Sequence, residues 1–488
     1  DAVEHGPANH FPATVLQNLP NARFYLTHGA ASRLYERRYV DLCRSEQITA
    51  EQIEKVIIDL AVNHHKRIRD LRLEDIQSDR LINRLFERTG YSFKQLRTQV
   101  EQSLVEKIRA GTEEIHGKRF MHTAPHHDDI MLGYMPHIYH LVRSPENTHF
   151  FNYMTSGFNA VTNNYMLELL HSVLIYMQTP DFERRAAENY FTTQSRIFRN
   201  RDVYHYLDGV AGHHHSLKKE AVSRRLLRNL VQLYGAGMRE LPDRVHSLID
   251  YFHSVYPGKK DIDDVQKLKG MIREWEADLL WAHMGFDSRS VNHLRLGFYQ
   301  GDLFARDPDA ERDIQPILNL FRQIKPDVLT VAFDPEGSGP DTHYKVLQAV
   351  ATALVQYCRE SERDIEVWGY RNVWYRFHPS DANIFVPVSL NSMAVLENAF
   401  LNSFGSQRNA SFPSPELDGP FPRLVQKIHA EQFYALKTCL GQDFFNENLH
   451  PRIRAMHGVC FIKKMTIEEF IEKTLTLKQR MQIEDESC

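Results

Sequence analysis

Strand-like and helix-like patterns alternate along the chain from about residue 118, and this alternation restricts the fold more than any other feature. The runs KRFMHTA (118–124), THFFNYMTSG (148–157) and PDVLTVAF (326–333) are short and rich in β-branched and aromatic residues, as strands are. Apolar residues at 314, 317, 318, 321 and 324 share one helix face. Because alternating strands and helices build a parallel sheet covered on both faces, we predict an α/β fold with a doubly wound, mainly parallel, Rossmann-like sheet.

The chain of 488 residues is too long for one core, since single cores stop growing at roughly 250–300 residues. We place the α/β domain at 118–488, after a segment 1–45 and a charge-rich, helical region 46–117 with a helix start at Thr49. Residues 179–278, approximately, lack strand patterns and predict a helical insertion, and helices with a polar tail close the chain. Both a lid over a substrate and a subunit interface in a homo-oligomer fit the composition of the insertion.

The composition excludes several classes of partner and of structural site. The 59 Lys+Arg nearly cancel the 63 Asp+Glu, so no basic field is available to follow a nucleic-acid backbone. The sequence lacks the ~20 continuous apolar residues of a membrane span, and its amino terminus lacks an export pattern. The five cysteines form no CxxC pair, which argues against a disulfide scaffold and a thiolate zinc site. We predict a cytoplasmic protein without nucleic-acid or membrane partners.

The stretch TAPHHDDIMLGY (123–134) places two histidines and two aspartates directly after a predicted strand. His126 and Asp129, joined by His343 from the loop after another predicted strand, form the two-imidazole, one-carboxylate set of a catalytic zinc site. Asp128, which is not a ligand, is the candidate general base. Two alternatives stay open: the run could be solvated or cap the next helix, and His343 could simply follow a helix start at which Asp341 is the N-cap.

Several motifs resemble the LmbE-like, or PIG-L-type, zinc-dependent de-N-acetylases. APHHDD is similar to the first motif of that family, THFFNYMTSG to its second strand, IREWEADLLWAHMGF to its Arg-x-x-Glu helix, and IKPDVLTVAFDPEGSGPDTHYKV to its histidine loop. The resemblance implies Zn²⁺ or another divalent metal at His126, Asp129 and His343, and Asp128 as the base. It places Arg273 near the substrate, although an i,i+3 salt bridge with Glu276 on the helix surface fits equally well.

The same resemblance makes Ser156 a candidate substrate-binding residue, with a tight turn over 155–157 as the alternative. It implies removal of acetyl from an amino sugar, N-acetylglucosamine or its 6-phosphate. The chain also departs from the family, because Pro340 stands where a second histidine is usual. Glu336, Asp341 and His127 are candidate substitutes. Loss of such a group costs roughly two or three orders of magnitude in rate, so the rival hypothesis is an inactive sugar-phosphate sensor or a scaffold for a deaminase.

The first 45 residues carry a second resemblance. The segment from Val3 to Ser32 is similar to the end of a glucosamine-6-phosphate deaminase domain, with a Gly-Pro turn, an Ala-x-x-Leu-Gln helix and a final strand. This resemblance implies a relation to bacterial proteins that join such a deaminase to a de-N-acetylase-like domain. Because the chain begins at Asp1 rather than Met, we expect a fragment or a processed form and assign no deaminase activity to it.

Overall fold

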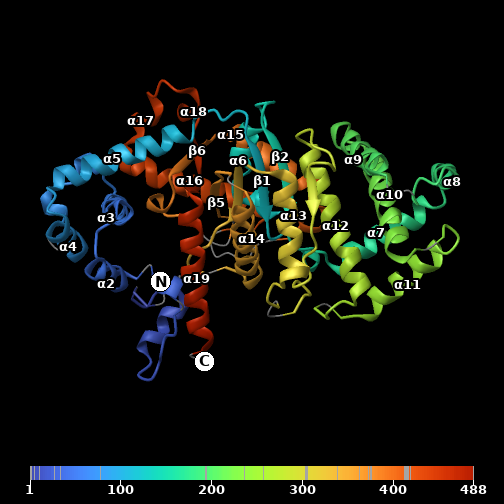
Figure 1. Cartoon of the computed structure of the whole chain (residues 1–488), viewed down its shortest axis with the longest axis horizontal. Coiled ribbons are helices and arrows are strands. Elements are labelled where there is room, and N and C mark those ends of the chain that lie inside the picture. Colours follow the sequence, from blue (N-terminus) through green and yellow to red (C-terminus); the bar gives the residue numbers. More distant parts are fainter. Residues whose placement is uncertain are drawn as a thin grey trace.

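The computed structural model of the chain describes residues 3–486 except 5, 10, 27, 33, 77–78, 193–194, 236, 257, 303–305, 338, 362, 372, 374–375, 411–416 and 418, and it describes 28 and 482–486 by their backbone alone. Over these residues a seven-stranded sheet lies at the centre, in the order β3-β2-β1-β4-β5-β7-β6 (Figure 1). The strands are β1 (Arg119–Ala124), β2 (Thr148–Tyr153), β3 (Val291–His293), β4 (Val328–Ala332), β5 (Glu366–Tyr370), β6 (Ile384–Val388) and β7 (Gly458–Met465).

Five strands are parallel, and the chain reverses its direction of travel across the sheet at β1. Strand β1 pairs with β2 on one side and with β4 on the other, and the pairs β2–β3 and β4–β5 extend the sheet outward. The predicted α/β fold with a doubly wound, mainly parallel sheet is therefore confirmed. In such sheets the crevice outside the carboxyl ends of the two strands that flank the reversal is the usual ligand site.

The far end of the sheet differs from the prediction. Strand β7 is antiparallel to both β5 and β6 and lies between them, so the last part of the chain does not consist of helices alone. Nearly every residue of β7 is buried, because both of its faces are covered. A strand buried on both faces lacks the apolar–polar alternation by which a half-exposed strand is found in a sequence.

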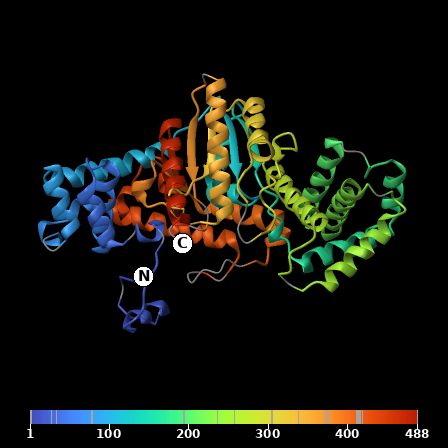
Figure 2. The ribbon, with the colours of Figure 1, turned by 60° about the horizontal axis from the view of Figure 1, so that its bottom comes forward.

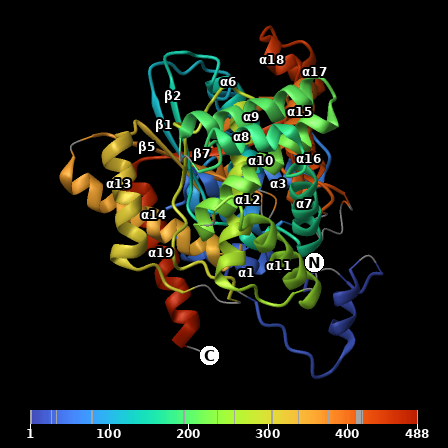
Figure 3. The same ribbon diagram turned by 90° about the vertical axis from the view of Figure 1, so that its right-hand side faces the viewer.

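Helices cover both faces of the sheet, as Figure 3 shows. One face carries α13 (Gln315–Ile324), α14 (Asp341–Glu360) and α19 (Ile467–Glu486). The other carries α6 (Asp129–Leu141), α15 (Leu390–Ser403) and α16 (Phe421–Leu440), and the short helices α17 (Gln442–Asn446) and α18 (Pro451–Arg454) follow α16. Helix α19 is more than a surface helix, since Phe470 and Leu477 are buried in the core beside α14. No helix in the described ranges is long and apolar enough to cross a membrane.

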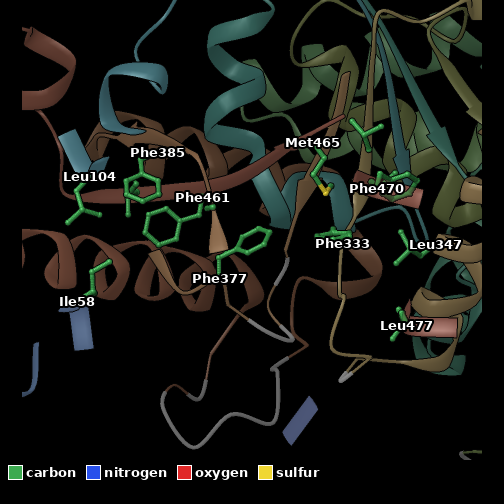
Figure 4. Packing of buried hydrophobic residues seen from close by; sticks show 14 of the residues in the cluster. Ile58, Leu104, Phe333, Leu347, Phe377, Phe385, Phe461, Met465, Phe470 and Leu477 are labelled. Atoms are coloured by element: carbon green, nitrogen blue, oxygen red, sulfur yellow. The ribbon is translucent and has the colours of Figure 1, made fainter. Parts of the chain in front are cut away.

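The region 46–117 is helical and packs on the edge of the sheet. It contains α3 (Ala50–Asn63), α4 (Arg80–Thr89) and α5 (Phe93–Ala110), and Thr49 caps α3 in a capping box as its pattern predicts. Ile58 and Leu104 from these helices belong to the same buried cluster as Phe385 of β6 (Figure 4). At the end of α5, a Cβ on Gly111 would lie 1.9 Å from the Phe385 carbonyl oxygen, so only glycine permits this approach.

The helical insertion projects from the opposite edge of the sheet (Figure 2). Its helices begin at α7 (Asn163–Tyr176), earlier than the predicted residue 179, and end with α12 (Asp263–Ala282). Between these lie α8 (Pro180–Ala187), α9 (Arg196–Ala211), α10 (His215–Tyr234) and α11 (Leu241–Ser254). The insertion has an apolar core of its own, and α12, which is buried along most of its length, connects that core to the sheet.

The first 45 residues form the 3₁₀ helix η1 (Pro12–Asn18) and the helices α1 (His28–Ala31) and α2 (Tyr35–Arg44). The final strand implied by the deaminase resemblance is not formed over residues 22–26, which are irregular. Strands need a partner for their backbone hydrogen bonds, and no described strand of the sheet pairs with this segment.

Candidate metal centre and its cavity

Two polar loops meet where the order of the strands reverses. The loop that contains His126 joins β1 to α6, and a longer loop joins β4 to α14, in which His343 occupies the first turn. Because β1 and β4 are parallel neighbours, both loops leave the sheet at the same edge. The predicted placement of both loops at one edge of the sheet is therefore confirmed, although nothing in the sequence established the distance between them.

The structure brings His126, Asp129 and His343 together. Asp129 Oδ2 lies 3.5 Å from His126 Nδ1 and 3.5 Å from His343 Nε2, and one donor atom from each residue lies within 4.8 Å of the others. Two ligands that each bind a tetrahedral zinc ion at about 2.1 Å stand about 3.4 Å apart. The donor types and their spacing thus fit a divalent metal.

The protonation of the buried donors also suits metal binding, which requires ionised carboxylates and neutral imidazoles. Burial alone would raise the pKa of Asp129, but the nearby His343 and hydrogen bonds from His126 outweigh it and lower the pKa to about 2. Burial lowers the pKa of His343 below its usual value, so its ring is neutral at pH 7. The backbone N–H of His126 donates to Asp129 Oδ2 at 2.7 Å and fixes that carboxylate in the loop.

Asp128 stands beside the three donors and has partners of its own. Its Oδ2 accepts a hydrogen bond of 2.7 Å from Gln407 Nε2, and its Oδ1 lies 3.4 Å from Arg273 Nη2. Asp128 occupies the N-cap position of α6, but its side chain accepts no cap hydrogen bond. The helix-cap alternative is therefore wrong for Asp128, whose carboxylate is held in the cavity instead.

Arg273 forms the predicted pair with Glu276 and also contacts Asp128. Its Nη1 donates to Glu276 Oε2 at 2.7 Å, the expected i,i+3 pair, while its Nη2 faces Asp128. This pair does not lie on a helix surface: the side chains of Arg273 and Glu276 are each 1% exposed, because α12 passes through the interior. Arg273 Nη1 also donates to Gln407 Oε1 at 2.7 Å. Gln407 thereby joins Arg273 to Asp128.

A cavity of about 210 Å³ opens over these groups. Its wall includes His126, Asp128, Asp129 and His343, together with residues that no motif indicated: Asn159, Tyr299, Val373, Gln407 and Phe421. Arg273 lines the cavity, whereas Ser156 lies against Gly270 of α12, where an added Cβ would stand 2.9 Å from Ser156 Cβ. The neighbouring Gly157 adopts a φ of 58° and forms part of the cavity wall in place of Ser156.

Glu336, Asp341 and His127 are the candidates to replace the second histidine of the family, whose place is taken by Pro340. None of these three is among the described residues that line the cavity. Glu336 pairs with Arg371 at 2.7 Å, and Asp341 pairs with Lys345 at 3.1 Å. His127 is buried behind the metal loop, with its Nε2 3.3 Å from His293 Nδ1.

Pro340, rather than Asp341, is the N-cap residue of α14, and Asp341 is its first residue. Proline suits this entry into the helix because its φ is fixed near −65°.

Part of the chain is similar to a curated protein. A putative glucosamine-6-phosphate deaminase-like protein from Bacteroides thetaiotaomicron is 29% identical over 161 residues, which make up 32% of this chain and 24% of that protein. The chain thus matches about a quarter of the length of its relative. This finding shows a similarity to a glucosamine-6-phosphate deaminase-like protein over part of the chain, whereas the placement of that similarity in residues 1–45 stays a prediction. No protein-family model matches the chain, so the resemblance to LmbE-like enzymes stays a prediction from the motifs.

Proposed function

We propose that the protein is a metal-dependent hydrolase that removes the acetyl group from an N-acetylated amino sugar, N-acetylglucosamine or its 6-phosphate. The observation that carries the proposal is the convergence of His126, Asp129 and His343 on one point, with Asp128 beside them and a cavity above. The amino sugar is inferred from the LmbE-like motifs and from the description of the relative as glucosamine-6-phosphate deaminase-like.

The residues have distinct roles in this reaction. His126, Asp129 and His343 would hold the metal, which when bound lowers the pKa of a water molecule to about 7 and polarises the amide carbonyl. Asp128 accepts the proton of the attacking water and transfers it to the nitrogen as the C–N bond breaks, which gives acetate and a free amine. Gln407 and Arg273 fix the Asp128 carboxylate from both oxygens, so its rotamer is set before the substrate arrives.

Metal content and acetate release, measured on the same preparations, test the proposal. Asp128→Ala should keep the metal and lose acetate release, because Asp128 is not a ligand, whereas His126→Ala should lose both. Asp364→Ala, which removes an exposed carboxylate, is the matched control and should change neither. Turnover that persists in Asp128→Ala or His126→Ala would contradict the mechanism.

One observation favours a second candidate function, an inactive member of the family that senses a sugar phosphate or supports a deaminase. Pro340 occupies the place of the usual second histidine, and Glu336, Asp341 and His127 do not line the cavity to replace it. This candidate predicts one equivalent of bound metal and stabilisation by sugar phosphates, without acetate release from any N-acetylated sugar. Acetate release that requires Asp128 would exclude it.

A further inference from the structure

A second and larger cavity lies in the helical insertion. It has a volume of about 790 Å³ and is bounded by α7, α9, α10 and α12 and by the 3₁₀ helix η7 (Gly405–Gln407). Helix η7 separates it from the candidate metal centre: Gln407 faces Asp128, whereas Gly405 and Ser406 line the second cavity. Small-molecule sites in proteins have volumes of about 300–1,000 Å³, so this cavity can hold a ligand larger than water.

The charged side chains of the second cavity favour an anion. Among the described residues that line it are Lys218, Lys219 and Arg408, opposed by a single carboxylate, that of Glu168. None of the three cations forms an ion pair with any described residue, although Arg408 Nε donates to the Leu401 carbonyl at 2.9 Å. Cations that have no carboxylate partners in a cleft create a positive electrostatic potential in the space between them, which attracts anions.

Lys218 and Arg408 also influence each other directly. Burial and the nearby Arg408 guanidinium lower the pKa of Lys218 below its usual value. Two like charges held close together repel, and an anion placed between them removes that repulsion while it gains charge-assisted hydrogen bonds. Phosphate suits such a pair because it offers several acceptor oxygens to a planar guanidinium and to an ammonium.

Three aromatic side chains also form part of the wall. Tyr165, Tyr206 and Trp275 line the second cavity, and the Tyr206 and Trp275 rings meet edge to face at 5.7 Å. Tyr206 is held in place because its hydroxyl donates to the Asn402 carbonyl at 2.9 Å. The Tyr165 hydroxyl lies so close to Gly405 that a Cβ there would stand 2.2 Å from it. A rigid aromatic wall with polar edges suits a ring that carries hydroxyl groups.

We propose that the second cavity is a binding site for a small phosphate ester of a sugar, with the phosphate at Lys218 and Arg408 and the sugar ring against Tyr206 and Trp275. The proposal does not rest on the function proposed above, because it uses no metal-binding residue and no acetate chemistry.

Calorimetric titration of the full chain with glucose 6-phosphate tests the site, with inorganic phosphate and unphosphorylated glucose as comparison probes. Glucose 6-phosphate should bind, inorganic phosphate should bind at least tenfold more weakly, and glucose should show no heat. The variant Lys218→Glu/Arg408→Glu should weaken glucose 6-phosphate binding at least thirtyfold. Lys94→Glu, which reverses an exposed charge on α5, should leave the affinity unchanged.

A second measurement locates the ligand by fluorescence. Glucose 6-phosphate should change the tryptophan emission of the wild type, and Trp275→Phe should remove that change while it retains binding. Lack of glucose 6-phosphate binding, or equal affinity in the double charge-reversal variant, would overturn the proposal. Equal affinity for inorganic phosphate would overturn its sugar part. Since no assay measures acetate, a failure here is separate from a failure of the hydrolase proposal.

Discussion

The substitution Gln407→Glu places a second carboxylate against Asp128. Gln407 Nε2 now donates to Asp128 Oδ2 at 2.7 Å, and Gln407 is buried. Two charges about 4 Å apart repel by about 4 kcal/mol at an effective dielectric constant of 20. Arg273, which lies 2.7 Å from Gln407 Oε1, offsets part of this repulsion. We therefore expect a net penalty of about 2–3 kcal/mol when both carboxylates are ionised, equivalent to about two pH units of proton affinity.

The sign of the pH dependence follows from the shared proton. The folded variant holds a proton on this pair up to about pH 6, whereas an unfolded glutamate releases it near pH 4.3, so the folded state binds more protons in between. Relative to the wild type, the variant should regain about 1.5–2 kcal/mol of its free energy of unfolding when the pH falls from 8 to 5.

Urea unfolding at pH 5, 6, 7 and 8 measures this difference without any activity assay. Gln407→Leu is the matched control: it loses the same hydrogen bonds without adding charge, so its deficit relative to the wild type should not vary with pH. A Gln407→Glu deficit that is equal at pH 5 and pH 8 would refute the contact between residues 407 and 128 as the source of the effect.

Three further outcomes are expected. A chelator should lower the Tm of the wild type but not that of His343→Ala, and metal at 1,000 times its Kd corresponds to about 4 kcal/mol of stabilisation in a thermal scan. Burial lowers the pKa of His137 to about 3, so below pH 6.5 the unfolded wild type binds a proton that the folded state does not, and its free energy of unfolding falls. Between pH 7 and 5.5 the free energy of unfolding of His137→Leu, measured in urea titrations, should therefore fall by about 1.2 kcal/mol less than that of the wild type. Gly133→Ala would place a Cβ 2.3 Å from Tyr370 Cδ2 and should cost about 1–3 kcal/mol in the same titrations, whereas Gly237→Ala, which meets open space, should not show this loss; equal losses in the two variants would contradict the packing described.

The parts of the candidate site that follow strands could be predicted from the sequence. Because parallel strands end at one edge, the polar residues after β1 and β4 could be placed together from their patterns. Gln407 could not be found in this way, since it lies 279 residues beyond Asp128 on a short 3₁₀ helix without a motif. The prediction that Arg273 and Glu276 pair on a helix surface is wrong for a related reason. An arginine and a glutamate three residues apart are usual on a solvated helix face, and only the packing of the insertion against the sheet places this pair inside the protein.

The position of β7 between β5 and β6 governs when this protein can fold during its synthesis. Residues 458–465 supply the hydrogen bonds that join β6 to the rest of the sheet, so β6 has no partner in the sheet until residue 465 has left the ribosome. Helix α5 packs on β6 and must wait as well, although it is synthesised well before β7. Until then the unpaired edges of β5 and β6 are open to pairing with another chain. Truncation before residue 458 should therefore produce aggregation rather than a smaller folded protein.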